Sequence, residues 1–394
     1  MSKCELKPGV YWVGGIDWDL RSFHGYTTDR GTTYNAYLIV DEKIVLVDTV
    51  KHYLFDEMLE RIREIVDPSK IDILVSNHTE MDHSGSLEKM VALNPNAAVV
   101  CSPNGEKNLR RHFKKDWNFK VVKTGDTIKI GKRTLAFQLL PMIHWPDSMA
   151  TYIPEDRLLL PNDAFGQHIA TAERFDDELD WGVLREEAAK YWANIVLPYS
   201  DQVKGALPAV AALSFDMIGP SHGVIWRSRI PDILKEYTKW ANNETEKRAL
   251  IVYETMWHST EMMAHRLKQG LEDAGVPVTM RRLGIGHLSD IITDVLSARL
   301  ILLGSPTLNN GMMPTMGEFL TYVKGLRPKK RIGFCFGSFG WGGQAVGEME
   351  AVVKDMGWEM PRKGINLKFI PDESELAACH EAGRALGEQL NKQV

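Results

Sequence analysis

The sequence predicts an α/β protein with two domains: a first domain of short strands and a few helices, then a doubly wound parallel sheet of five strands. The chain has 394 residues, which is more than one domain usually holds. The polar stretch ANNETEK (241–247) interrupts the apolar pattern. After it, strand-like apolar runs alternate with helical ones, as in a sheet covered by helices on both faces. We therefore expect domains at 1–246 and 247–394.

Strands and turns dominate the first domain. Residues 33–49, TYNAYLIVDEKIVLVDT, are typical of two strands joined by a polar turn, and residues 56–66 have the apolar spacing of a helix. The run KIDILVSN (70–77) predicts a buried strand. We also expect extended backbone at 134–144 and 194–200, because both are apolar runs.

The second domain alternates strand and helix. The five predicted strands are RALIVYE, PVTMRRLG, RLILLGSP, RIGFCFGSFG and GINLKFI. The predicted helices that follow them are STEMMAHRLKQGLEDAG, SDIITDVLSA, MGEFLTYVKGL, AVGEMEAVVKDMG and SELAACHEAGRALGEQL. This order is that of successive βα units.

Composition excludes several classes of protein. The net charge of −5 argues against a nucleic-acid partner, which would favour a basic surface. No apolar run approaches the roughly 20 residues that span a bilayer, and we expect no secretory leader and no membrane association. The four cysteines are far apart and form no Cys-x-x-Cys pair, so we expect neither a rubredoxin module nor an iron–sulfur cluster within these residues. Free thiols suit a reducing cytoplasm.

The stretch SNHTEMDHSG (76–85) places His78, Glu80, Asp82 and His83 within six positions. Two acids so close together would repel each other without a cation. In extended backbone, side chains two apart point the same way, so His78, Glu80 and Asp82 could face one side. Adjacent ligands at 82 and 83 suit two ions better than one. A polar surface loop is the alternative, but this stretch directly follows a predicted buried strand.

Three more possible ligands follow apolar runs: His144 in LPMIHWPDS, Asp163 in RLLLPNDAF and His222 in FDMIGPSHG. Singly, each could be a core histidine, a turn aspartate or a helix cap. Together they repeat one arrangement, a ligand where a strand gives way to a loop. Ligand type alone leaves zinc and manganese possible beside iron. His24 and Tyr199 are candidate proton donors near the cluster, or else ordinary packing or surface residues.

Three loops at predicted strand ends of the second domain indicate a ligand pocket. VYETMWHSTE (252–261) leads into a helix, whose N-terminal N–H groups attract anions, and its hydroxyls suit a phosphate. A plain helix cap is the alternative. LLGSPTLNNG (302–311) and CFGSFGWGGQA (335–345) follow the third and fourth strands. Trp341 could stack on a flat ring, or be a core or interface residue. No Gly-x-Gly-x-x-Gly opens the domain, so NAD is not the first choice.

The pattern His-x-Glu-x-Asp-His, with a later His, Asp and His, resembles the metallo-β-lactamase fold in its flavodiiron form, over the first 240 residues. The resemblance implies an αββα sandwich. It also implies that one iron binds His78, Glu80 and His144, that the other binds Asp82, His83 and His222, and that Asp163 bridges them. Zinc hydrolases of this fold usually have histidine where Glu80 stands, and a hard anionic oxygen helps to stabilise ferric iron.

Residues 247–394 resemble flavodoxin, which implies bound FMN. The phosphate would lie among Thr255, Met256, Trp257, His258, Ser259 and Thr260. The isoalloxazine would lie among Pro306, Thr307, Leu308, Asn309, Ser338, Phe339, Gly340, Trp341 and Gly342. The sequence departs from flavodoxins at His258, where glycine is common.

The whole chain is similar to A-type flavodiiron proteins, the rubredoxin:oxygen oxidoreductase family. The resemblance implies an enzyme that reduces dioxygen to water, nitric oxide to nitrous oxide, or both, with electrons passed through FMN from rubredoxin or a similar donor. It also implies a head-to-tail homodimer, and possibly a dimer of dimers. The alternative is a di-zinc hydrolase with a flavodoxin-like appendage, which metal analysis would distinguish. A pure electron carrier would leave the seven metal-binding candidates unexplained.

Overall fold

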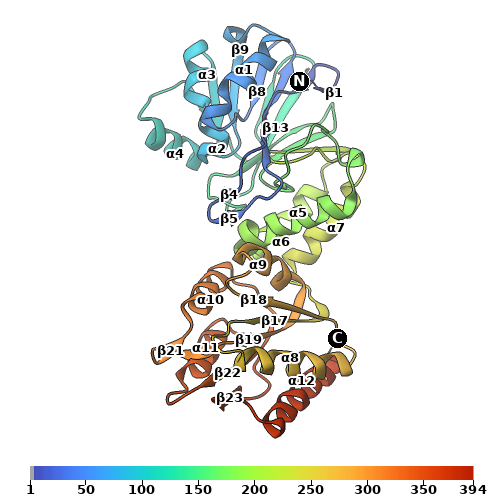
Figure 1. The fold of residues 1–394 in the computed structure, drawn as a ribbon. Coiled ribbons are helices and arrows are strands. Elements are labelled where there is room, and N and C mark those ends of the chain that lie inside the picture. Colours follow the sequence, from blue (N-terminus) through green and yellow to red (C-terminus); the bar gives the residue numbers. More distant parts are fainter. Residues whose placement is uncertain (1–3, 394) are drawn as a thin grey trace. The chain divides into compact units, whose positions relative to one another are not determined.

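Residues 4–393 are described by a computed structural model (Figure 1). The chain divides into two compact units. The first unit holds the residues up to Tyr191 together with Tyr199–Thr238, and the second holds Trp192–Pro198 together with the residues from Lys239 onward. Because the chain crosses between the units more than once, the single boundary at residue 247 stays a prediction.

Two sheets form the first unit. The seven-stranded sheet has the order β1-β2-β7-β8-β9-β10-β11, and its last four strands run parallel. Its strands are β1 (Cys4–Lys7), β2 (Val10–Trp12), β7 (Tyr37–Val40), β8 (Ile44–Val47), β9 (Ile71–Ser76), β10 (Ala98–Cys101) and β11 (Phe119–Val121). The five-stranded sheet is mostly antiparallel, but its last pair, β15-β16, is parallel. Its strands are β12 (Thr127–Lys129), β13 (Thr134–Leu139), β14 (Met149–Ile153), β15 (Leu158–Asn162) and β16 (Met217–Pro220).

Alternating side chains build two cores from the seven-stranded sheet. In β9, Val75 packs into the core shared with the five-stranded sheet, where it meets residues such as Phe137 and Leu160. Its neighbour Leu74 points the other way and packs with Met58 and other side chains of the covering helices. The helices of this unit are α1 (Phe55–Arg63), α2 (Met81–Ser84), α3 (Leu87–Leu93), α4 (Pro103–Phe113), α5 (Trp181–Tyr191), α6 (Ser200–Ala211) and α7 (Ile230–Ala241). The sandwich of two sheets between helices confirms the predicted αββα class.

Two small antiparallel pairs complete the first unit. They are β3 (Gly15–Asp17) with β6 (Thr32–Tyr34), and β4 (Ser22–Phe23) with β5 (Tyr26–Thr27).

The second unit contains the predicted five-stranded parallel sheet, in the order β18-β17-β19-β22-β23. Its strands are β17 (Glu246–Tyr253), β18 (Val278–Arg282), β19 (Ala298–Gly304), β22 (Ile332–Phe339) and β23 (Ile365–Lys368). The helices are α8 (Ser259–Asp273), α9 (Leu288–Ser297), α10 (Pro314–Leu326), α11 (Gln344–Asp355) and α12 (Glu373–Gln393). α8 and α12 cover one face, where Leu267 and Leu386 pack against Ile251 and Phe334. A short hairpin that the sequence did not predict, β20 (Thr307–Leu308) and β21 (Gly311–Met312), follows β19.

The extended backbone expected at 194–200 is wrong. Trp192–Val196 continues α5 as a π-helix, and Leu197–Tyr199 is a 3-10 turn. The Asn194 side chain accepts a hydrogen bond from the Tyr322 hydroxyl (2.8 Å) and donates one to the Ser289 carbonyl (3.2 Å). Such tertiary partners decide the conformation of a short apolar run, since periodicity alone cannot distinguish strand from buried helix.

Across residues 4–393, no helix combines the length and the apolar character that a membrane crossing requires. All four cysteines are free thiols.

Glu187 on α5 should make the stability of the chain depend on pH. Its buried carboxylate accepts a hydrogen bond from Arg30 Nε (3.0 Å), and burial raises its pKa to about 7, from 4.5. Because the folded state holds this proton more tightly than the unfolded state does, the associated stability is lost as pH rises from 4.5 through 7. Glu187→Gln stays neutral. We expect it to gain stability relative to wild type across this window, by about 1–3 kcal/mol.

Thermal unfolding at several pH values would measure this difference. Glu60→Gln is the control, since Glu60 is an exposed glutamate on a helix of the same unit. A difference between Glu187→Gln and wild type that does not change with pH would contradict the expectation.

Candidate metal centre and ligand pocket

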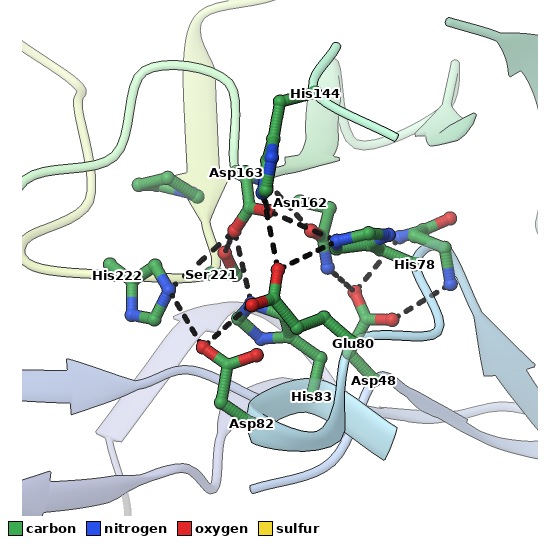
Figure 2. Close-up of polar contacts among 12 residues, drawn as sticks. Asp48, His78, Glu80, Asp82, His83, His144, Asn162, Asp163, Ser221 and His222 are labelled. Carbon is green, nitrogen blue, oxygen red and sulfur yellow. Dashed lines mark hydrogen bonds and ion pairs between the residues drawn. The ribbon is translucent and has the colours of Figure 1, made fainter. Parts of the chain in front are cut away.

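The first unit gathers seven acidic and histidine side chains at one end of its two sheets (Figure 2). Residues that follow β9, β15 and β16 supply most of them, because the carboxyl ends of these strands meet there. The loop between β13 and β14 adds one more. The seven are His78, Glu80, Asp82, His83, His144, Asp163 and His222. His144 lies five residues beyond β13 rather than directly at its end.

The sequence analysis assumed extended backbone for the segment that carries four of these residues, but only part of the segment is extended. Glu80 has extended backbone, but Met81–Ser84 forms the short helix α2. This turn brings Asp82 and His83 close to His222, and the three side chains form a second group of possible ligands. Its backbone is held to the sheet, since the Thr49 amide donates to the His83 carbonyl (3.0 Å).

Asp163 stands between two groups of side chains. Its Oδ2 lies 3.2 Å from His144 Nε2 and 3.5 Å from His78 Nε2. Its Oδ1 lies 3.0 Å from His83 Nε2 and 3.5 Å from His222 Nε2. The first group is completed by Glu80, whose Oε2 lies 3.2 Å from His144 Nε2. One carboxylate thus presents an oxygen to each group, as a bridging ligand would.

Unpaired polar atoms indicate that cations belong in this site. Both carboxylate oxygens of Asp82 and both ring nitrogens of His83 are buried without a hydrogen-bond partner. Yet Asp82 Oδ2 lies 3.3 Å from both His83 Nε2 and His222 Nε2. Buried polar atoms without partners are costly, and an ion bound by the Asp82 carboxylate and by Nε2 of His83 would give those atoms a partner. The donor set of three carboxylates and four imidazoles fits two metal ions.

The acidic and basic groups of the cluster hold one another charged. Burial acts to raise the pKa of Asp163, but the neighbouring histidines His83, His144 and His78 hold that pKa well below its usual range. Burial acts to lower the pKa of His83, but the carboxylates of Asp82 and Asp163 raise it to about 9. The carboxylates are therefore ready to bind cations, which would replace the protons on the histidines.

Hydrogen bonds to groups outside the cluster orient the rings of two histidines. Asp147 Oδ2 accepts from His78 Nδ1 (3.1 Å), from the Thr79 amide (2.8 Å) and from Thr79 Oγ1 (2.9 Å). His222 Nδ1 donates to the Thr33 carbonyl (2.8 Å). In both rings Nε2 is left to face the cluster, an arrangement common around protein-bound metals.

The buried carboxylate of Asp48 connects the ends of β9 and β15 by hydrogen bonds. It accepts hydrogen bonds from the Asn77 amide (2.8 Å), the Asn77 side chain (3.1 Å) and the Asn162 side chain (3.1 Å). Asn77 precedes His78 and Asn162 precedes Asp163, so Asp48 ties both sheets together beside their metal-binding candidates (Figure 2).

The sequence analysis did not single out Asp147, Asp48 or His168. An acid three residues after His144, in HWPDS, could have been noticed as a hydrogen-bond acceptor for a ligand. His168 is buried with its ring 4.6 Å from that of His222, and its burial lowers its pKa well below the usual range. Nothing in its local sequence predicts that placement.

Asp147→Asn should weaken metal binding without unfolding the chain. An amide in this position cannot match the negative charge that orients His78, and losses of this kind cost about 10- to 100-fold in metal affinity. Chelator competition followed by metal analysis would measure the loss. The control is Asp126→Asn, because Asp126 is exposed and accepts only a loop hydrogen bond from the Lys123 amide (2.8 Å). Equal metal affinity in the two variants would argue against the role of Asp147.

The two predicted proton donors differ in their surroundings. His24 lies in the β4–β5 turn, where His24 and Gly25 both have positive φ (49° and 85°), as a type I′ hairpin turn requires. Its Nε2 hydrogen-bonds Glu80 Oε1, and this bond raises the pKa of His24. Tyr199 ends the Leu197–Tyr199 turn, and within residues 4–393 no hydrogen bond joins it to the seven side chains. Both roles stay predictions.

The second unit contains a pocket of about 740 Å³ at the carboxyl ends of its strands. This volume is typical of cofactor sites. Thr255 Oγ1, just before α8, is buried without a hydrogen-bond partner, as expected where a phosphate would accept. Trp257 and Trp341 are 85% and 93% exposed, which leaves their rings free to meet a flat ligand. The lining residues are Met256, Trp257, Ser259, Pro306, Thr307, Asn309, Asn310, Ser338, Phe339, Gly340, Trp341, Gly342, Phe369 and Ile370.

Four predicted pocket residues are not among those that line the pocket: Thr255, His258, Thr260 and Leu308. Thr260 Oγ1 is 3.0 Å from Ser338 Oγ, and Leu308 belongs to β20. His258 has a left-handed backbone (φ 67°), and its Nδ1 lies 2.6 Å from Glu261 Oε2. Asn310, Phe369 and Ile370 line the pocket but were not predicted, although Phe369 and Ile370 follow the fifth strand just as the predicted loops follow earlier strands.

Comparisons with known proteins cover both domains. Residues 32–223 match the family described as ODP family beta lactamase, and residues 251–383 match flavodoxin. A nitric oxide reductase from Moorella thermoacetica is 45% identical over 391 residues, 98% of each chain. The structure of a rubredoxin oxygen:oxidoreductase from Desulfovibrio gigas has a TM-score of 0.97 and 38% identity, covering 99% of both chains. The flavodiiron protein of Giardia intestinalis has a TM-score of 0.97 and 35% identity, covering 100% of this chain and 97% of that one.

Proposed function

Since the chain belongs to the flavodiiron protein family, we propose that it reduces dioxygen to water, nitric oxide to nitrous oxide, or both. It is an oxidoreductase with FMN and a di-iron centre. The observation that carries the proposal is the convergence of three carboxylates and four histidines on one point, with Asp163 facing both halves of the cluster. A di-zinc hydrolase is not supported, because the related proteins are named as oxidoreductases.

We propose that one iron binds His78, Glu80 and His144, and that the other binds Asp82, His83 and His222. Asp163 bridges them. A flavin held in the second unit would supply electron-transfer chemistry, and two irons held by these residues would supply redox chemistry toward a small oxidant. The protein contributes fixed geometry, since Asp147 and the Thr33 carbonyl hold two of the imidazoles in place.

Reduction of either gas consumes protons, and we propose that His24 supplies them. Its ring is exposed, so it exchanges protons with solvent, while its Nε2 holds a hydrogen bond to Glu80 Oε1. The raised pKa of His24 keeps a proton at this atom more often than in a free histidine. Tyr199 remains the second candidate donor.

The flavin would occupy the pocket of the domain proposed at 247–394. The α8 N-terminus and the hydroxyls of Thr255 and Ser259 would hold its phosphate. The unpaired Thr255 Oγ1 supports this placement. The glycine-rich loop at 340–342 and Trp341 would contact the ring. His258 is engaged with Glu261, so it would influence the phosphate through that pair.

The donor and the assembly are also proposals. The name of the related Desulfovibrio gigas protein, rubredoxin oxygen:oxidoreductase, supports rubredoxin or a similar carrier as donor. Exposed apolar side chains around the pocket, which include Trp257, Trp341 and Ile370, support a protein partner there, because monomers rarely expose such patches. We propose a head-to-tail homodimer, testable by analytical ultracentrifugation, and a cytoplasmic location that suits the four free thiols.

The stoichiometry of gas consumption tests the function. The metal- and FMN-loaded protein, given a reduced rubredoxin, should use about four electrons for each dioxygen and release no hydrogen peroxide. The same protein stripped of iron by a chelator is the control. Stoichiometric peroxide, or a purified protein that holds two zinc ions per chain and no iron, would contradict the proposal.

A further inference from the structure

Phe369 lines the pocket of the second unit, and its backbone is strained. It directly follows β23 and has a left-handed backbone conformation (φ 60°). Bulky side chains rarely adopt this conformation, because the β-carbon crowds the backbone. The Phe369 amide donates a hydrogen bond to the carbonyl of Phe339, the last residue of β22 (2.7 Å), and this bond holds the turn in place. The sheet therefore imposes a costly position on this residue.

Burial accounts for a second phenylalanine with the same conformation, but not for Phe369. Phe165 (φ 69°) is buried in the first unit, where its ring packs against that of Tyr237 with 4.3 Å between the centroids. Phe369 is 59% exposed, so burial in a core does not offset its strain. Strained residues cluster at sites that bind ligands. The exposed ring of Phe369 is therefore a candidate contact for a ligand of the pocket.

The ring of Phe369 lies against the glycine-rich loop of the same pocket. A β-carbon placed on Gly340 would lie 3.2 Å from Cε1 of Phe369, so the missing side chain of Gly340 lets the ring come this close. Gly340 and Trp341 line the pocket together with Phe369 and Ile370. The loop after β22 and the residues after β23 thus form one apolar side of the pocket, which suits a flat aromatic ligand.

We propose that Phe369 packs against the isoalloxazine ring of FMN and is a main determinant of FMN affinity. The proposal rests on the placement of the flavin in this pocket, which is itself proposed above. Two aromatic rings in contact gain more than the burial of their areas alone. The ligand would also cover apolar surface that Phe369 and Ile370 expose, and this burial would offset the backbone strain.

Phe369→Asn tests the contact, because asparagine removes the ring but adopts the left-handed conformation readily. We expect FMN affinity to fall about tenfold, as for the loss of one aromatic contact, while the melting temperature of the flavin-free chain does not fall. Phe369→Tyr keeps the ring and should keep the affinity of the wild type. Titration of the flavin-free chain with FMN, followed by flavin fluorescence, measures the affinity. The control is Ile285→Asn, since Ile285 is 79% exposed in the same unit and does not line the pocket.

Unchanged FMN affinity in Phe369→Asn would overturn the proposal, and so would equal losses in the asparagine and tyrosine variants. Ser259→Asp separates this failure from that of the flavin placement. If Ser259→Asp releases FMN while Phe369→Asn does not weaken it, the placement stands and the role of Phe369 is wrong. If neither variant weakens FMN, the placement itself is wrong. Unchanged affinity with a weaker dimer in ultracentrifugation would assign Phe369 to a protein interface instead. Should Phe369→Asn fail to fold, Phe369→Gly replaces it, because glycine adopts this conformation freely.

Discussion

Replacing Asp163 with asparagine is expected to remove both irons while the flavin stays bound. Asp163 is buried and is the one carboxylate whose two oxygens face both groups of ligands, at 3.0–3.5 Å from four histidine Nε2 atoms. An amide has no charge, and its N–H group would point at a cation or at an imidazole. Because removal of a supporting residue alone costs about 10- to 100-fold, loss of this bridge should lower activity by more than about 100-fold.

Metal analysis and the absorbance of bound flavin measure the two cofactors separately. Asp19→Asn is the control, since Asp19 is an exposed aspartate of the same domain. Loss of flavin together with iron would contradict two independent sites. Full iron content in Asp163→Asn would argue that Asp163 does not bridge the metal ions.

Ser259→Asp should release FMN while iron stays in place. Ser259 is the first residue of α8 and lines the pocket. A carboxylate is tolerated at a helix N-terminus, so the fold should persist, but it would repel a phosphate of charge about −2. Two unit charges about 4 Å apart interact by roughly 4 kcal/mol near a protein surface, so we expect FMN affinity to fall on the order of 10²- to 10³-fold.

Titration of the flavin-free protein with FMN, followed by flavin fluorescence, measures this affinity. Ser259→Asn is the matched control, because it has the same size as the aspartate variant without its charge. If both variants lost affinity equally, steric crowding rather than phosphate repulsion would be the cause, and the placement of the phosphate beside Ser259 would lose its support.

The sequence predicted the parts of this molecule that depend on local pattern. Regular alternation after residue 247 predicted the five parallel strands of the second unit, since each strand and helix has its own periodicity. Four possible ligands in residues 78–83 predicted a cation site, because acids so close together need one. His222 and Asp163 could be added since each follows an apolar run, and strand ends at one edge lie close together.

Features that depend on distant partners could not be predicted. The helical form of 194–200 reflects hydrogen bonds of Asn194 to Ser289 and Tyr322, far away in sequence. Asp48 and His168 acquire their places only when two sheets pack. The helical turn at Met81–Ser84 replaced the assumed extended backbone, and the amide of Thr49, which donates to the His83 carbonyl of this turn, lies on another segment.

The hydrogen bonds of Asp48 to Asn77 and Asn162 hold the two sheets together at the end where the metal-binding candidates lie. Iron bound by the proposed ligands of the folded chain would add further cross-links between these same segments, so the iron concentration would influence how often this end of the sandwich opens. Transient opening is what proteases exploit. In a cell short of iron, the protein would therefore lose its activity. Proteases would also degrade the iron-free chain faster, so the abundance of the protein would follow the supply of iron.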